Sequence, residues 1–78
     1  MVIKILGTGC PKCKKLEEEA RKALAESGIE ATVEKVTELN DIMGYGVMMT
    51  PALVIDEKVV SAGKVLKSQK IISLLQKQ

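Results

Sequence analysis

The chain has 78 residues, of which 46% are hydrophobic, with one Tyr, no Trp and no Phe, so we expect one small domain over residues 1–78 with an aliphatic core. The formal net charge is +2, from 12 basic and 10 acidic residues that are interspersed along the chain. This balance and the lack of aromatic platforms exclude an ordinary nucleic-acid-binding surface, and we expect no nucleic-acid partner.

The chain begins with an apolar run, residues 2–6, that is rich in β-branched side chains. Such a run predicts a strand that is covered on both faces. The run is too short for the apolar region of a secretion signal, and no stretch reaches the roughly 20 apolar residues of a membrane span. We therefore expect a cytoplasmic protein that does not associate with membranes.

A long amphipathic helix is predicted to follow this strand. Pro11 suits the first helical position, where its missing N–H costs nothing, and Gly28 is typical of the residue just past a helix end. Acid–base pairs four residues apart, such as Glu17 and Arg21, occupy the polar positions between the apolar ones. The apolar positions recur at helical spacing and comprise Cys13, Leu16, Ala20, Ala23 and Leu24.

The middle of the chain indicates a second strand and a short helix. Residues 29–36 hold Ala31, Thr32 and Val33 among charged side chains, which favours a strand. Thr37 is a candidate cap for a short helix that Gly44-Tyr45-Gly46 would end.

The last part of the chain indicates a hairpin and a final helix. Residues 52–55 and 58–62 are short β-rich runs joined at Asp56-Glu57, and residues 68–75 form an amphipathic helix. The predicted order is β-α-β-α-β-β-α. This order indicates an α/β fold with a four-stranded mixed sheet flanked by helices, in which the first two strands are parallel and the last two antiparallel.

The two cysteines of the chain, Cys10 and Cys13, lie together between the first strand and the first helix. The positive end of a helix stabilises a thiolate, so Cys10 is expected to be the exposed, attacking sulfur. Cys13 falls on the apolar face and is expected to be buried and to resolve the mixed disulfide. Lys12, Lys14 and Lys15 form either an ordinary solvated face or a charge that supports the thiolate and steers an acidic partner. This arrangement favours a thiol–disulfide oxidoreductase.

The same cysteine spacing leaves a second class of function open, a carrier of soft metal ions. Thiolates so spaced suit Cu(I) or Zn(II), and metallochaperone domains also place them between a first strand and a first helix. Two ligands make an incomplete site, which a partner or a dimer would have to finish. A third alternative is a scaffold whose motif has lost its chemistry. For the favoured oxidoreductase we expect no metal and no cofactor.

A second diagnostic segment precedes the third predicted strand. Thr50-Pro51 leads into that strand and is compatible with a trans or a cis peptide bond. Met48 and Met49 are expected to fill gaps in the core. Beside the dithiol they would instead form an adaptable apolar rim for a protein partner.

Together these features resemble the thioredoxin superfamily, in particular its small redox-active disulfide proteins of archaea and bacteria. The resemblance covers essentially the whole chain and rests on residues 7–13, 49–56 and 59–64. It implies one thioredoxin-like domain in which Pro51 follows a cis bond and lies against the dithiol, while Thr50 offers its backbone to the substrate. The site residues that it implies are the reactive Cys10 and Cys13, supported by Pro11, Lys12, Met49, Thr50, Pro51 and Gly63.

The resemblance also implies partners and a role in electron transport and cell redox homeostasis. A protein substrate that contains a disulfide would be reduced, and a thioredoxin-reductase-like donor would restore the dithiol of a monomeric protein. The sequence departs from ordinary thioredoxins in lacking a Trp before Cys10 and a buried acid in the first strand, where Lys4 is the only charge. The glutathione signature of glutaredoxins is reduced to Gly63-Lys64, so the resemblance does not imply glutathione dependence.

Overall fold

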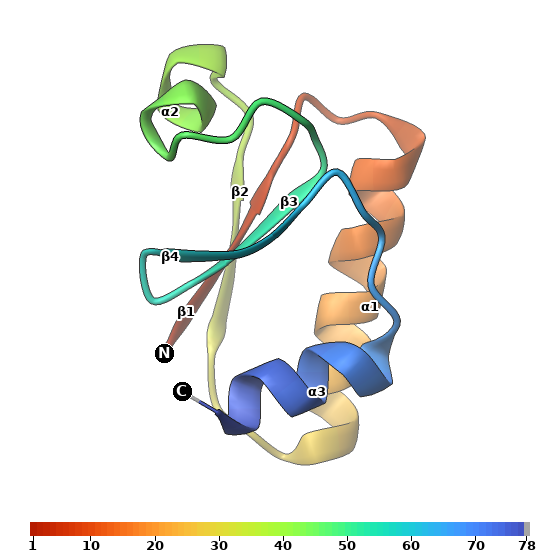
Figure 1. Cartoon of the computed structure of the whole chain (residues 1–78). Helices are drawn as coiled ribbons and strands as arrows, with labels where there is room; N and C mark the ends of the chain where they lie inside the picture. Colours follow the sequence, from red (N-terminus) through yellow and green to blue (C-terminus); the bar gives the residue numbers. More distant parts are fainter. Residues whose placement is uncertain (78) are drawn as a thin grey trace.

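The computed structural model describes residues 1–77, and its elements follow the predicted order β-α-β-α-β-β-α (Figure 1). The predicted α/β fold with a four-stranded mixed sheet flanked by helices is confirmed. The elements are β1 (Val2–Leu6), α1 (Pro11–Ser27), β2 (Thr32–Val36), α2 (Leu39–Gly44), β3 (Ala52–Ile55), β4 (Lys58–Ala62) and α3 (Ser68–Gln76).

The strands lie in the order β2-β1-β3-β4, so β1 occupies an interior position. It runs parallel to β2 and antiparallel to β3, and β3 and β4 form the predicted antiparallel hairpin. Ile5 lies between Lys35 of β2 and Leu53 of β3. This register fixes which side chains lie beside the end of β1, where the cysteine motif begins.

Two predictions about the middle of the chain are wrong in detail. The second strand begins at Thr32 rather than at residue 29, because Ile29 leaves the helix end and packs against the core before the chain pairs with β1. Thr37 is not a helix cap: α2 begins one residue later, its N-cap is Glu38, and no side chain caps it.

The two faces of the sheet carry separate apolar clusters. Helices α1 and α3 cover one face, where Leu16 and Ile71 pack with Ile5 of β1. Helix α2 covers part of the other face, where Ile42 packs with Leu6. The prediction that the first strand is covered on both faces therefore holds at its C-terminal end, which leads to the cysteines.

Lys4 lies on the same face as α2, in a polar cluster with Tyr45 and Glu57. Its ammonium donates hydrogen bonds to the Glu57 carboxylate at 2.5 Å and to the Tyr45 hydroxyl at 2.9 Å. The Glu57 carboxylate, followed by Tyr45, raises the pKa of Lys4 above its ordinary value, and Lys4 in turn lowers the pKa of Glu57. The only charged side chain of β1 is thus held in an ion pair at the hairpin turn.

The turn of the hairpin has left-handed backbone at both central residues. Asp56 has φ 48° and Glu57 has φ 69°, the signs that a type I′ turn requires. The Asp56 carboxylate also accepts a hydrogen bond from the Val2 backbone N–H at 2.9 Å. The predicted hairpin is confirmed.

A side chain of α1 caps the N-terminus of helix α3. Its own N-cap, Lys67, makes no side-chain cap bond, and the Glu19 carboxylate accepts the Ser68 backbone N–H at 2.9 Å instead. Ser68 is 5% exposed, so without Glu19 this donor would lie buried and unpaired. Cap bonds of this kind contribute about 1 kcal/mol. The two helices are therefore tied together through this contact.

We expect Glu19→Ala to lower the free energy of unfolding by about 1 kcal/mol because the Ser68 donor loses its acceptor. Urea denaturation measures the difference. Glu18→Ala is the matched control, since Glu18 is an exposed carboxylate on the same helix. Equal stability of the two variants would show that the contact does not cap α3.

Candidate functional site

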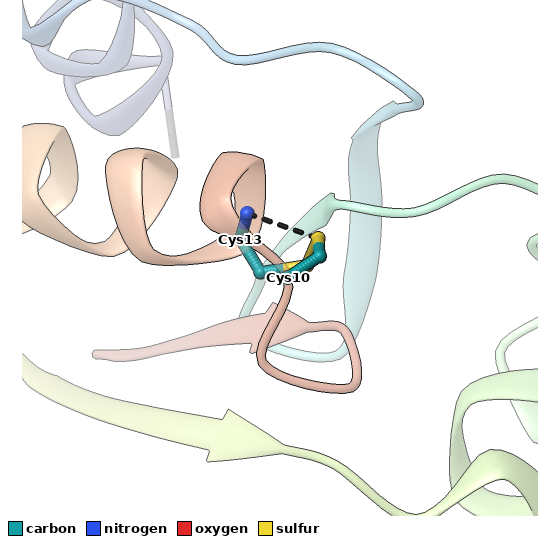
Figure 2. Close-up of a disulfide and its surroundings, with 2 residues drawn as sticks. All are labelled: Cys10 and Cys13. Atoms are coloured by element: carbon teal, nitrogen blue, oxygen red, sulfur yellow. Dashed lines mark hydrogen bonds between the residues drawn. A yellow bond between two sulfur atoms is a disulfide. The ribbon is translucent and has the colours of Figure 1, made fainter.

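Cys10 and Cys13 form a disulfide at the N-terminus of α1 (Figure 2). Cys10 follows the short loop after β1 and is the N-cap residue of α1, with extended backbone at φ −65° and ψ 163°. Pro11 occupies the first helical position. The Cα atoms of the two cysteines are 5.0 Å apart. The backbone N–H of Cys13 donates a hydrogen bond to Cys10 Sγ at 3.2 Å. The sulfur of Cys10 thus occupies the place of a capping oxygen.

The two sulfurs differ in their surroundings. Cys10 is half-buried, whereas Cys13 is 5% exposed and belongs to the buried face of α1. This is the order of exposure that helical phase predicts. The first turn of α1 contains no acidic residue, and Lys12 and Lys14 are exposed beside the motif. A helix N-terminus with nearby cations favours a thiolate over a thiol once the disulfide is reduced.

Gly7 makes room for the sulfur of Cys13. A Cβ placed on Gly7 would clash with Cys13 Sγ and lie 3.1 Å from Cys13 Cβ. The same Cβ would lie 4.0 Å from the Cβ of Thr50, so the loop before Pro51 reaches this point as well. Sequence reasoning did not single out Gly7. The signal that was present is its position at the end of an apolar strand, directly before the cysteine motif.

Three of the predicted site residues, Met49, Thr50 and Pro51, lie together in the loop before β3, and a fourth, Gly63, packs against that loop. The Thr50-Pro51 peptide bond is cis, as the family resemblance implies, and Pro51 is buried. The Gly63 backbone N–H donates to the Pro51 carbonyl at 2.8 Å. Gly63 has φ 75°, and a Cβ there would lie 3.1 Å from the Cβ of Met49. Gly63 therefore allows the chain after β4 to lie against this loop.

The expectation that Met48 and Met49 fill the core is wrong. Met48 is 98% exposed and Met49 is 64% exposed. Val47 and Pro51 take the buried positions of this loop, so the methionines between them face outward. The alternative prediction, an apolar rim, fits these exposures.

A cavity of about 570 Å³ lies beside residues 7–10, the loop between β1 and α1 that we call the dithiol loop. Thr8 and Thr50 line it on the side of the cysteine motif. Side chains of α2 and of the loop that follows α2 line the rest. The remaining lining residues are mainly apolar and comprise Leu39, Ile42, Met43, Gly46, Val47 and Met48.

Among residues 1–77, no group of three or more His, Cys, Asp or Glu side chains is placed to hold a metal ion. In the same part of the chain, no helix is long and apolar enough to cross a membrane.

Known proteins resemble this chain over almost its whole length. The family described as "Thioredoxin domain" matches residues 1–76. A protein of Methanocaldococcus jannaschii named thioredoxin is 42% identical over 71 residues, which is 91% of this chain and 81% of that protein. A protein of Methanothermobacter thermautotrophicus, also named thioredoxin, is 39% identical over 75 residues, or 96% of this chain and 97% of that protein.

Proposed function

The chain belongs to the thioredoxin domain family, and from this premise we propose that it reduces disulfides in partner proteins by cycling the Cys10–Cys13 pair between dithiol and disulfide. The observation that carries the proposal is the placement of both sulfurs at the start of α1, bonded to each other and unequally exposed. A thiolate that is exposed at a helix N-terminus is suited to attack another disulfide, and a neighbouring buried thiol is suited to displace the product.

The first step is attack by the Cys10 thiolate on one sulfur of the partner's disulfide. A mixed disulfide forms, and the partner's second sulfur leaves as a thiolate that takes up a proton. Cys13 then loses its proton and attacks Cys10 Sγ. The Cys10–Cys13 disulfide forms, and the partner's first sulfur leaves with the electron pair and takes up a proton from solvent. Two electrons have then passed to the partner, which has also taken up two protons, and a thioredoxin-reductase-like donor must restore the dithiol of the protein.

The surface around Cys10 supports a protein substrate. The cavity beside the dithiol loop is apolar, and the exposed thioethers of Met43 and Met48 at its edge adapt to different apolar side chains. Lys12 and Lys14 are exposed beside the cysteine motif and add positive charge there. We therefore expect the partner to present an apolar side chain near an acidic one beside its disulfide.

Removal of the two lysine charges tests this expectation. The double variant Lys12→Gln/Lys14→Gln should slow the reaction with an acidic disulfide peptide at low salt, because charge steering raises association rates. The difference should shrink as salt rises, since salt screens exposed charges. Lys22→Gln/Lys70→Gln, which removes the same charge from residues outside the cysteine motif, is the control. Equal rates for both double variants would rule out local steering.

A single pair of assays tests the oxidoreductase against the metal carrier. The reduced protein should accelerate reduction of insulin disulfides by dithiothreitol, and it should compete poorly with a Cu(I) chelator. A metal carrier would give the opposite pair of results, tight Cu(I) binding without accelerated reduction. An intact fold with neither activity would indicate a scaffold.

A further inference from the structure

The proton of Cys13 needs an acceptor, on the assumption that the proposed disulfide exchange is correct. Cys13 must become a thiolate before it can attack Cys10, yet its side chain is 5% exposed. The first strand offers no acceptor, because Lys4 is a cation that is bonded to Glu57 and Tyr45. The acceptor must therefore lie elsewhere around Cys13.

A small cavity of about 100 Å³ lies against Cys13. It is large enough for a few water molecules, each of which takes up about 30 Å³ in the liquid, and its lining supplies polar partners for them. The lining residues come from the end of β1, the dithiol loop, α1 and β2 with the residue that follows it, and comprise Ile5, Gly7, Gly9, Cys13, Lys14, Glu17, Lys35 and Thr37.

Glu17 is the carboxylate among these lining residues. It follows Cys13 by four residues on α1, so both side chains lie on one face of the helix. Its side chain is 16% exposed and is held in place from two elements. Arg21 Nη2 lies 2.9 Å from one oxygen, and Lys35 Nζ lies 3.3 Å from the other.

The charges that face Glu17 keep it ionised. The hydrogen bond from Arg21 is the largest cause that lowers the pKa of Glu17, and the hydrogen bond and charge of Lys35 lower it further against the opposing effect of burial. Lys14 also lines the cavity. At neutral pH a carboxylate able to accept a proton is therefore always present beside the cavity.

We propose that Glu17 accepts the proton of Cys13, through water in this cavity, when Cys13 attacks the mixed disulfide. The Cys13 proton passes to water, and a proton passes from water to the Glu17 carboxylate, which then returns it to the solvent. The Cys13–Cys10 bond forms as the bond between Cys10 and the partner's sulfur breaks. Glu17 ends the step unchanged.

The two release phases of the reaction with 5,5′-dithiobis(2-nitrobenzoate) separate the two cysteines. Attack by Cys10 releases the first coloured thiolate, and attack by Cys13 on the mixed disulfide releases the second. In Glu17→Gln we expect an unchanged first phase and a second phase at least ~10-fold slower at neutral pH, a minimum set below the roughly 10²–10⁴-fold that general acid–base catalysis contributes. The deficit should vanish at high pH, where hydroxide removes the proton.

Three comparison variants make the result decisive. Glu18→Gln, which removes a neighbouring exposed carboxylate, should match the wild type in both phases. Arg21→Met breaks the ion pair but keeps the carboxylate, so its second phase should not slow as in Glu17→Gln. Glu17→Asp should be intermediate, because it restores the carboxylate at a greater distance.

An unchanged second phase in Glu17→Gln, or an equal slowing in Arg21→Met, would overturn this role for Glu17. Slowing of both phases together would also overturn it, because it would indicate a general structural defect. Absence of a second phase in the wild type would instead contradict the proposed disulfide exchange itself.

Discussion

A Cys10→Ser variant is expected to lose all disulfide reductase activity. Dithiothreitol should then reduce insulin disulfides at the same rate with the variant as without any protein. Cys10 is the half-buried sulfur at the N-cap of α1, and a hydroxyl in its place cannot form a mixed disulfide. The serine oxygen can still accept the Cys13 backbone N–H, because Ser is a favoured N-cap residue. The fold should therefore persist while turnover is lost, and insulin reduction together with circular dichroism measures both.

Cys13→Ser is expected to fail at the later step. Cys10 still attacks, but no second thiol displaces the partner, so a mixed disulfide accumulates in a one-to-one ratio. Non-reducing mass spectrometry detects this complex, and dithiothreitol should release it. Turnover that survives in Cys10→Ser, or a complex that forms equally well there, would contradict the assigned order.

Gly7→Ala is expected to disturb the dithiol more than the same change at any other glycine, because only at Gly7 does the added Cβ clash with a cysteine side chain. The new Cβ would clash with Cys13 Sγ, and both residues are buried, so one of them must shift to accommodate it. Extra methyl groups in packed interiors cost about 1–3 kcal/mol. We expect a loss of this size in unfolding free energy for the oxidised protein, together with slower closure of the Cys10–Cys13 bond. Urea denaturation and the second release phase measure the two effects.

Gly44→Ala is the matched control for this change. A Cβ on Gly44 would meet nothing within 4 Å, and Gly44 ends the short helix α2. Alanine is the better helix former, so this variant should be as stable as the wild type or slightly more stable. If Gly7→Ala were equally well tolerated, the close approach of Gly7 to Cys13 would not constrain the site.

Much of the fold was predictable because local signals agreed with tertiary needs. Pro11 and Gly28 mark both ends of α1, and the structure places α1 at Pro11–Ser27 with Gly28 in left-handed backbone. The Asp56-Glu57 turn was found because a two-residue connection between β-rich runs has few alternatives. The different exposure of the two cysteines followed from helical phase alone.

The errors arose where tertiary packing decides between two local options. The apolar sequence around Met48 predicts a core residue. In the structure Val47 and Pro51 occupy the buried positions of this loop, and Met48 is exposed. Thr37 has the chemistry of a helix cap, yet β2 ends at Val36 and α2 begins only at Leu39, so that Glu38 takes the N-cap position.

The functional surroundings of Cys13 were also beyond the sequence. Glu17 reads as half of a surface ion pair with Arg21, and that pair does form. Its four-residue spacing from Cys13 was visible in the sequence, but its contact with Lys35 exists only because β2 pairs with β1. Gly7 likewise gains its importance from a contact with a side chain six residues later.

The identity of the attacking sulfur is tested most directly by labelling the fully reduced wild-type protein. Treatment with less than one equivalent of iodoacetamide at neutral pH, followed by fragmentation mass spectrometry, shows which sulfur reacts. A thiolate at the N-cap of α1 predicts that the label lies almost entirely on Cys10, because Cys13 is buried. Label mainly on Cys13, or shared equally between the two, would contradict the division of roles on which the proposed reaction rests.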